Sequence, residues 1–261
     1  MGNEGAQARQ GDPQVIQQEG ADLLSNKGQA ELTGQYQKAV QNHQLLSDLL
    51  TKVGYQTTSR PITNLKNPDT TIKKVVEKRV DEDSNYDLND VGDISRGRLV
   101  FADEKALRTG LNTLKSEAKR DGIRVVKEQD MFTNPDSEAQ KSGYKGYHVD
   151  LEMPNGQHVE VQLHTVNSYA SAMLTHAIYQ SYGDNPPKTA AAESKAVADH
   201  VMRMNPQQAK ELGRQLEGAS APAAVEAQQK AMQVAMGQNQ APHAEPLQEI
   251  PGRYQQTANG I

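Results

Sequence analysis

The sequence predicts an α/β domain at about residues 50–185, built as a mixed or antiparallel sheet with helices packed on it. Two observations predict this class. The apolar residues of this stretch follow the order strand, helix, strand, hairpin, helix, which is typical of a sheet covered by helices. Glutamine is concentrated outside it, because residues 1–50 hold 10 Gln and residues 201–261 hold 11, against 6 in residues 51–200. We therefore expect a folded centre with polar flanks that are helical or disordered.

Domain boundaries follow from this distribution. We assign residues 1–54 to a Gln-rich N-terminal helical region, residues 55–186 to the folded domain, and residues 187–261 to an Ala- and Gln-rich tail, helical or disordered. Within the tail, the Asn-Pro-Gln run at residues 205–207 predicts the start of a helix.

Two helices are predicted before the first strand. Leu32–Val53 carries leucines, valines and alanines at near-helical spacing, and Gly54 is the predicted end of this helix. Thr70–Val80 is predicted as a short helix, with isoleucine and valine on one side and lysines on the other. Each helix therefore has an apolar side that can pack.

The first predicted strand and the helix after it lie in the centre of the chain. The strand covers Ile94–Ala102 and contains the apolar run Leu-Val-Phe. Asp103 can cap the helix that follows, and Gly122 ends it in the left-handed conformation that glycine adopts readily. The next strand is Ile123–Val126, and a polar loop over residues 129–143 comes after it.

A hairpin over residues 147–164 is the clearest local signal. Apolar and polar residues alternate along both strands, which are joined by Pro-Asn-Gly at residues 154–156. A two-residue Asn-Gly loop would place Glu152 opposite Val159 and mix the two faces. A three-residue loop instead places Leu151 opposite Val159, and it suits a type I turn followed by a left-handed glycine. We therefore predict the three-residue loop.

The predicted register places two carboxylates opposite each other. Asp150 faces Glu160, and His148 faces Gln162. Facing carboxylates repel each other unless a metal ion, a basic side chain or a retained proton relieves them. An exposed polar ladder, in which water weakens the repulsion, explains the pattern equally well. Both interpretations stay open at this point.

The last helix of the domain is predicted at Val166–Tyr182. Its apolar stripe includes Tyr169, Ala170 and Met173. Glycine at position 183 and the two prolines that follow shortly after it end the helix.

Composition excludes several classes of protein. No segment approaches 18 apolar residues in a row, so no membrane span is expected, and the first residues lack the pattern of a Sec-type signal. The absence of cysteine excludes disulfides, zinc fingers and thiol catalysis. The net charge of −5 argues against a general nucleic-acid binder, so no DNA partner is expected. We expect a cytoplasmic bacterial protein, with delivery as a secreted or injected effector as the alternative.

Charge is unevenly distributed around residue 80. Residues 60–79 carry six basic and two acidic side chains, whereas residues 81–93 carry six acidic side chains and no basic one. A solvated surface is the usual meaning of such runs. The alternative is a phosphate-binding strip beside a metal-binding acidic edge.

Three motifs stand out in this central region. Residues 93–98 read Asp-Ile-Ser-Arg-Gly-Arg, residues 143–148 read Gly-Tyr-Lys-Gly-Tyr-His, and residues 160–165 read Glu-Val-Gln-Leu-His-Thr. Their order and spacing resemble the synthetase domain of the RelA/SpoT family, which makes the alarmone nucleotides (p)ppGpp. The resemblance covers about residues 60–182. Each motif alone is a weak signal, and their combination carries the resemblance.

The resemblance has departures as well as matches. Gly97 is shifted by one position from the glycine of the family motif, and His164 replaces an arginine of the catalytic motif. In the last helix, His176 and Tyr179 match a family pattern, but Gln180 stands where the family has a lysine.

The resemblance implies a nucleotidyltransferase-like synthetase fold and a Mg²⁺-dependent transfer of pyrophosphate from ATP to the 3′-hydroxyl of a nucleotide, with GDP or GTP as the first choice. It implies that Asp93 and Glu160 hold Mg²⁺, that Glu160 acts as the base, and that Arg98 neutralises charge on the transferred group. Tyr144 would stack on the acceptor base. The other implied substrate-binding residues are His148, Gln162, His164, Lys73, Lys74 and Lys78.

Several alternatives remain open from the sequence. An adenine nucleotide or the 3′ end of tRNA could replace the guanine nucleotide as acceptor. The departures at His164 and Gln180 also fit a catalytically altered relative that binds a nucleotide or a protein. The polar flanks fit a toxin-like module, a homo-oligomer, or an antitoxin-like partner bound through them.

Overall fold

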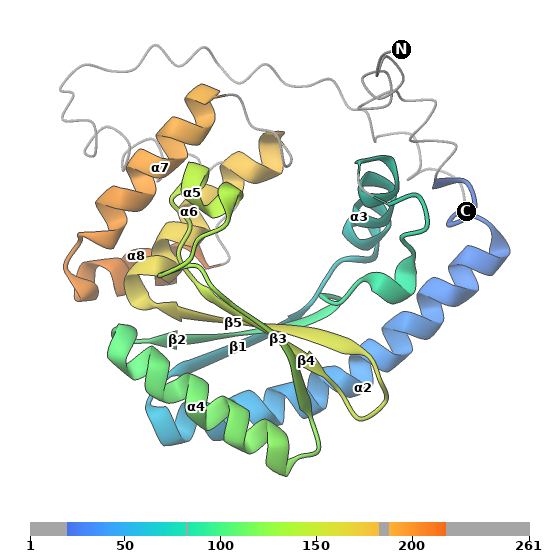
Figure 1. Ribbon diagram of the computed structural model, residues 1–261, viewed down its shortest axis with the longest axis horizontal. Helices are drawn as coiled ribbons and strands as arrows, with labels where there is room; N and C mark the ends of the chain where they lie inside the picture. Colours follow the sequence, from blue (N-terminus) through green and yellow to red (C-terminus); the bar gives the residue numbers. More distant parts are fainter. Residues whose placement is uncertain (1–19, 82, 183–187, 218–261) are drawn as a thin grey trace.

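The computed structural model describes residues 20–81, 83–182 and 188–217 (Figure 1). A five-stranded mixed sheet with helices packed on it confirms the predicted fold class. The elements are α2 (Asn26–Thr57), β1 (Arg60–Leu65), α3 (Pro68–Asp81), the 3₁₀ helix η1 (Leu88–Asp90), β2 (Ser95–Phe101), α4 (Glu104–Arg120), β3 (Arg124–Asp130), α5 (Ser137–Ser142), β4 (Tyr147–Glu152), β5 (His158–Thr165), α6 (Val166–Tyr182), α7 (Lys188–Met202) and α8 (Pro206–Leu216).

The five strands form one mixed, open sheet in the order β1-β2-β5-β4-β3. Strands β2 and β5 are parallel, and every other neighbouring pair is antiparallel. In the β4–β5 hairpin, Leu151 pairs with Val159 and Asp150 with Glu160. Gly156 has a φ of 81°, and its N–H donates to the Met153 carbonyl at 2.8 Å. Both the predicted register and the three-residue loop are therefore confirmed.

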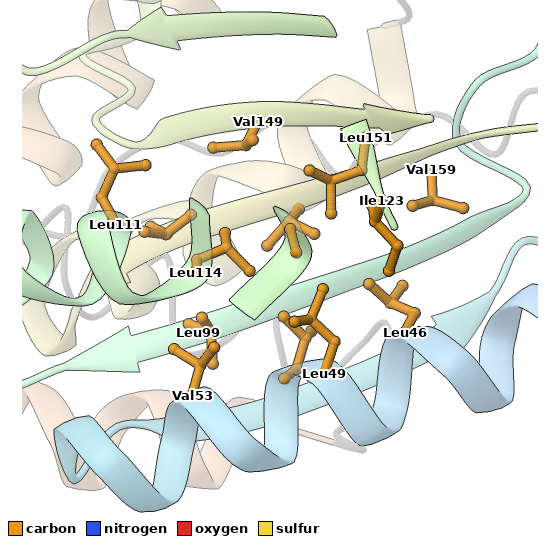
Figure 2. Close-up of a cluster of buried hydrophobic side chains, with 14 of the residues drawn as sticks. Leu46, Leu49, Val53, Leu99, Leu111, Leu114, Ile123, Val149, Leu151 and Val159 are labelled. Carbon is orange, nitrogen blue, oxygen red and sulfur yellow. The ribbon is translucent and has the colours of Figure 1, made fainter. Parts of the chain in front are cut away.

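The sheet has one apolar face and one polar face. Helices α2 and α4 lie against the apolar face, while α3 and α5 to α7 lie on the other side (Figure 1). Figure 2 shows how the side chains of the two helices meet those of the sheet. The buried cluster includes Leu46, Leu49, Leu50 and Val53 of α2, Leu107, Leu111 and Leu114 of α4, and Leu99, Val149, Leu151, Val159, Val161 and Leu163 of the strands. Because side chains alternate along a strand, the polar residues of the same strands face the opposite side.

Helix α2 is longer than predicted at both ends. The Ser25 hydroxyl caps its start by accepting from the Gly28 N–H at 3.1 Å. The predicted end at Gly54 is wrong, because the helix continues to Thr57 and stops at Thr58, which has a φ of 53°. Gly54 instead allows a close approach, since a Cβ added there would lie 3.0 Å from the Ser59 carbonyl oxygen.

Three strand and loop predictions need correction. Strand β1 was not predicted, because few of its residues are apolar; it pairs at the sheet edge, where Pro61 is tolerated. Strand β3 extends to Asp130 instead of ending at Val126. The predicted polar loop contains α5, a short helix capped by Asp136, whose side chain accepts from the Ala139 N–H at 2.8 Å.

Helices α6 and α8 agree with the patterns read from the sequence, whereas α7 was not predicted as a separate helix. Helix α6 has the predicted bounds, and α8 begins directly after its cap Asn205. Helices α7 and α8 share a buried cluster with α6 that includes Leu174, Val197 and Leu216. The side chains of His176, Tyr179 and Gln180 lie outside the described residues, as do residues 1–19 and 218–261 of the flanks. In the described part of the chain, no helix has both the length and the hydropathy needed to cross a bilayer.

Candidate active site

A run of hydrogen bonds crosses the polar face of the sheet. The Tyr144 hydroxyl lies 2.7 Å from Nε2 of His148, and Nδ1 of His148 lies 3.0 Å from Oε1 of Glu160. Nε2 of Gln162 donates to Oε2 of Glu160 at 3.1 Å, and Nε of Arg98 donates to Oε1 of Gln162 at 3.0 Å. Because a carboxylate only accepts hydrogen bonds, Nδ1 of His148 donates to Glu160, and Nε2 links the imidazole to the tyrosine hydroxyl. The structure thus connects five of the residues predicted for the site.

Strand register explains why these side chains meet. Arg98 on β2 and His148 on β4 both pair with Gln162 on β5, the central strand of the three. Residues two apart on a strand share a face, so Glu160 lies beside Gln162 on the same surface. The hydrogen-bonded run therefore follows from register and needs no irregular loop.

Glu160 is a carboxylate whose charge is stabilised by its neighbours. Burial pushes the pKa of Glu160 up, but the hydrogen bonds from His148 and Gln162 hold it below the ordinary value of 4.5. Facing it, Asp150 has a raised pKa, through burial first and then through the charge of Glu160. Two of the forms of relief predicted for this carboxylate pair have a counterpart here: His148 binds Glu160, and the raised pKa of Asp150 favours a retained proton.

A small polar cavity opens beside the two carboxylates. It measures about 140 Å³ and is lined by Lys127, Gln129, His148, Asp150 and Glu160. Its lining comes from β3, β4 and β5, so it lies on the polar face of the sheet. The carboxylate of Glu160 therefore lies against a space that a hydroxyl group could enter.

Asp93, two residues before β2, is held between two lysines. Nζ of Lys66 lies 2.9 Å from Oδ2 of Asp93, and Nζ of Lys74 lies 2.9 Å from Oδ1. Burial alone would raise the pKa of Asp93, but the two ammonium groups lower it overall. Burial also lowers the pKa of Lys66, and the attraction of Asp93 offsets this only in part. Two cations and one carboxylate thus form a compact charged cluster.

The structure distinguishes among the lysines that the sequence assigned. Lys74 reaches Asp93, whereas Lys73 pairs with Glu77 at 3.4 Å and its side chain is 53% exposed. Lys78 is half-buried one turn further along α3. Lys66 was not assigned, and the structure adds it. The position of Lys66 in the basic stretch could have indicated a role in the site. Lys66 was left out because this stretch fits the family motif only loosely.

Tyr144 and His164 pack against each other at the far end of the hydrogen-bonded run. Gly143, with a φ of 73°, ends α5 and turns the chain into Tyr144. The two rings meet edge to face with centroids 5.9 Å apart. His164 is only 1% exposed, and burial lowers its pKa to about 3, so it is a neutral ring. The position of the family's arginine is therefore occupied by a buried, uncharged side chain.

The carboxylates of the site are suitable ligands for a Mg²⁺ ion that the protein would bind together with a nucleotide. Among the described residues, no three His, Asp or Glu side chains converge on a metal position. Two carboxylates are nevertheless available, those of Asp93 and Glu160. They interact electrostatically, because the negative charge of Asp93 works against the hydrogen bonds that lower the pKa of Glu160. Mg²⁺ is usually held by one or two carboxylates together with substrate phosphates, which matches this donor set.

Comparison with known proteins agrees with this fold. Residues 63–184 match the family described as the region found in RelA / SpoT proteins. Among curated proteins, no sequence relative reaches significance. Among solved structures, the small alarmone synthetase 1 from Bacillus subtilis, bound to its product pppGpp, matches with a TM-score of 0.52 at 16% identity, over 73% of this chain and 98% of that chain. The protein smu.1046c from Streptococcus mutans UA159 matches with a TM-score of 0.50 at 18% identity, over 69% and 92%.

The mixed sheet with its matched central region defines a domain of the nucleotide pyrophosphokinase class. Residues 63–184 belong to the RelA/SpoT family, and the chain carries a synthetase domain of that family. At identities of 16% and 18%, the two solved structures show that the fold is shared.

Proposed function

We propose that this protein transfers the β,γ-pyrophosphate of ATP to the 3′-hydroxyl of an acceptor nucleotide in the presence of Mg²⁺. The observation that carries the proposal is the ionised Glu160, held by His148 and Gln162 within electrostatic reach of Asp93, which two lysines bind. A general base and a phosphate-binding cluster side by side are what such a transfer needs. The family match of residues 63–184 supports the reaction type.

The cations of the site would hold the ATP phosphates. Lys66 and Lys74 present two ammonium groups around Asp93, and Arg98 adds a guanidinium on β2. Phosphoryl-type transfers depend mainly on positioning and on neutralising negative charge. Asp93 and Glu160 would hold Mg²⁺, which supplies further charge neutralisation when bound.

Glu160 would take the proton of the acceptor. The 3′-hydroxyl oxygen attacks the β-phosphorus of ATP, the bond from that phosphorus to the α,β-bridging oxygen breaks, and AMP leaves. The hydroxyl proton passes to the Glu160 carboxylate. His148 keeps that carboxylate ionised and oriented through its Nδ1–H.

Tyr144 would bind the acceptor base by stacking. GDP and GTP are the proposed acceptors, and an adenine nucleotide or a tRNA 3′ end remains the alternative. Incubation of the protein with labelled ATP, Mg²⁺ and each of GDP, GTP, AMP, ADP, ATP and deacylated tRNA tests the proposal. We expect labelled acceptor and AMP in equal amounts with at least one of them. A folded protein that labels none of these acceptors would exclude the proposal.

A variant pair tests the role of the base. Glu160→Gln removes the proton acceptor and should lower turnover about 10²- to 10⁴-fold, which is the usual contribution of a general base. Glu152→Gln is the matched control, because Glu152 lies on the same hairpin and pairs with Arg124 instead of the site. A Glu160→Gln protein with full activity would contradict the assigned role.

A nucleotide-binding protein without turnover is the second candidate. The burial of His164, at the position of the family's catalytic-motif arginine, is the observation that favours it. Calorimetry that detects binding of ATP or GTP by a protein that forms no product in the labelling assay would support this candidate. For a toxin-like role, growth arrest on expression should be relieved by Asp93→Ala.

A further inference from the structure

Tyr144 is held in place by a second ring as well as by its own loop. Its hydroxyl binds His148 at 2.7 Å, and its ring meets His164 edge to face, with an interplanar angle of 87°. Gly146 gives the two rings their room. A Cβ at this position would lie 2.7 Å from the Tyr144 hydroxyl and 3.1 Å from Cε1 of His164. The position of Tyr144 therefore depends on where His164 lies.

His164 in turn is held from α6. Its Nδ1 lies 3.2 Å from the Ser168 hydroxyl, which also accepts from the Thr165 N–H at 2.9 Å. The Tyr169 ring packs against His164 with centroids 6.0 Å apart. The imidazole is almost completely buried, so it has no surface for a polar substrate group. Its contacts are those of a structural ring between two tyrosines.

Tyr169 is braced by the end of α8, which lies beyond the matched family region. The Arg60 guanidinium lies 5.4 Å from the centre of the Tyr169 ring, and Nη1 of Arg60 donates to Oε2 of Glu217 at 2.7 Å. Burial and the neighbouring Glu217 carboxylate raise the pKa of Tyr169. Gly213 of α8 packs on the ring, since an added Cβ would lie 3.1 Å from Cδ1 of Tyr169. A continuous series of contacts thus joins α8 to Tyr144.

We propose that His164 is a positioning residue that fixes Tyr144 for the acceptor base, and that Glu217 and Tyr169 make the C-terminal helix α8 part of the acceptor site. The inference rests on the proposed function for the meaning of "acceptor", but its contacts exist without substrate. It differs from the expectation that His164 binds substrate itself. Because the imidazole is neutral and buried, it acts on the acceptor only through Tyr144.

An activity-independent experiment tests the contacts first. In protein labelled at histidine Cε1, the NMR signal of His164 is assigned by its loss in His164→Phe. We expect this signal to move in Glu217→Gln and in Tyr144→Leu. The control Glu211→Gln should leave it in place, because Glu211 pairs with Arg214 at the exposed surface of α8. A signal that stays in place in both test variants would overturn the coupling.

Kinetics then tests the positioning role. His164→Ala should raise the acceptor KM about tenfold, the upper end of what one edge-to-face ring contact contributes, and leave the ATP KM unchanged. His164→Phe keeps a ring and should stay within about twofold of wild type. Glu217→Gln should raise the acceptor KM severalfold, whereas Glu211→Gln should not.

The outcomes separate this inference from the proposed function. If His164→Phe loses as much acceptor affinity as His164→Ala while both remain folded, the imidazole nitrogens contact the acceptor and the positioning role is wrong. Equal effects on both KM values would indicate a general loss of structure and also overturn it. A wild-type protein that labels no acceptor excludes the proposed function, and the histidine signals still decide the coupling.

Discussion

Replacing Lys66 by methionine should leave the protein at least as stable as wild type while it weakens ATP binding. The Lys66 side chain is 12% exposed and lies 2.9 Å from Asp93. Burial lowers the pKa of Lys66, the attraction of Asp93 offsets this only in part, and Lys74 and Arg96 add repulsion. A lowered pKa means that the fold disfavours the ammonium relative to water. Removing the charge therefore removes a cost.

The size of the stability change depends on the ion-pair partner that Asp93 keeps when Lys66 is replaced. Removing one partner of a buried ion pair usually costs about 3–5 kcal/mol, because the other charge is stranded. Here Lys74 still holds the second carboxylate oxygen at 2.9 Å, so Asp93 stays paired. Methionine fills a similar volume. We therefore expect the free energy of unfolding at neutral pH to change by between zero and about +2 kcal/mol in Lys66→Met.

The pH dependence of the free energy of unfolding is a second test of the sign of this stability change. Between its folded pKa and the ordinary value of 10.5, Lys66 binds a proton more readily in the unfolded state. The wild type therefore gains stability as the pH rises through this window, and the advantage of Lys66→Met disappears near the upper end. Urea denaturation at neutral pH and near the upper end of the window measures the difference.

Lys66→Met should weaken ATP binding even though it does not destabilise the protein. A hydrogen bond to a charged group contributes about 1.5–3 kcal/mol, so losing one from the ATP phosphates should raise the ATP KM about 10- to 150-fold. Lys52→Met is the control, because Lys52 pairs with Asp121 at 2.8 Å on the exposed surface. It should cost less than about 1 kcal/mol and leave the ATP KM unchanged. A loss of 3 kcal/mol or more in Lys66→Met, or an unchanged ATP KM, would refute the reasoning.

Three further changes should give distinct results. Gly97→Ala should lower the free energy of unfolding by roughly 1–3 kcal/mol, because the added Cβ would lie 2.3 Å from Cδ1 of Leu50; in urea denaturation, combination with Leu50→Ala should cost less than the sum of the two single changes. The fold lowers the pKa values of Asp93 and Glu160 below the ordinary 3.8 and 4.5, so both carboxylates stabilise the protein above those pH values. This stability should be lost as the pH falls through the pKa values of the folded state. Asp93→Asn should therefore flatten the acid limb of a stability–pH curve. Tyr144→Phe keeps the ring and loses its hydroxyl bond, so steady-state kinetics should show a kcat reduced about 2- to 10-fold and a nearly unchanged acceptor KM.

The hairpin and α6 could be predicted residue by residue because local rules decide them. Alternation along β4 and β5 leaves only a register that puts like faces together, and Pro-Asn-Gly supplies the turn that this register needs. Strand β1 follows no such rule. Its pairing with β2 is made by backbone groups at the sheet edge, and the sequence of an edge strand carries little periodic signal.

The sequence could not show which lysine of α3 contacts Asp93. Lys73 and Lys74 are adjacent on α3, so they point about 100° apart and only one of them can face Asp93. The choice is made by Val75 and Val76, which bury themselves in a cluster with Leu88 and Ile94 and so fix the rotation of the helix. That rotation is a property of tertiary packing, and no count of charges reveals it.

His164 was correctly placed on the polar side of β5, but its burial could not be predicted. Alternation assigns a residue to a face, and it does not say what covers that face. Here Tyr144 and Tyr169 cover the imidazole from two different elements. The same reasoning explains why a histidine can stand where the family has an arginine, since a covered position favours an uncharged ring.

The family region alone should not fold as an independent unit. Helix α2 lies before residue 63, yet Leu46, Leu49, Leu50 and Val53 are completely buried against the sheet. Burying one such side chain contributes about 1.5–3 kcal/mol, so the four together contribute about 6–12 kcal/mol, as much as the whole stability of a typical domain. A fragment of residues 55–186 should therefore show no cooperative unfolding in urea, whereas residues 20–217 should. Cooperative unfolding of the shorter fragment at the midpoint of the longer one would show that α2 is dispensable and that the site needs only the segment that carries its motifs.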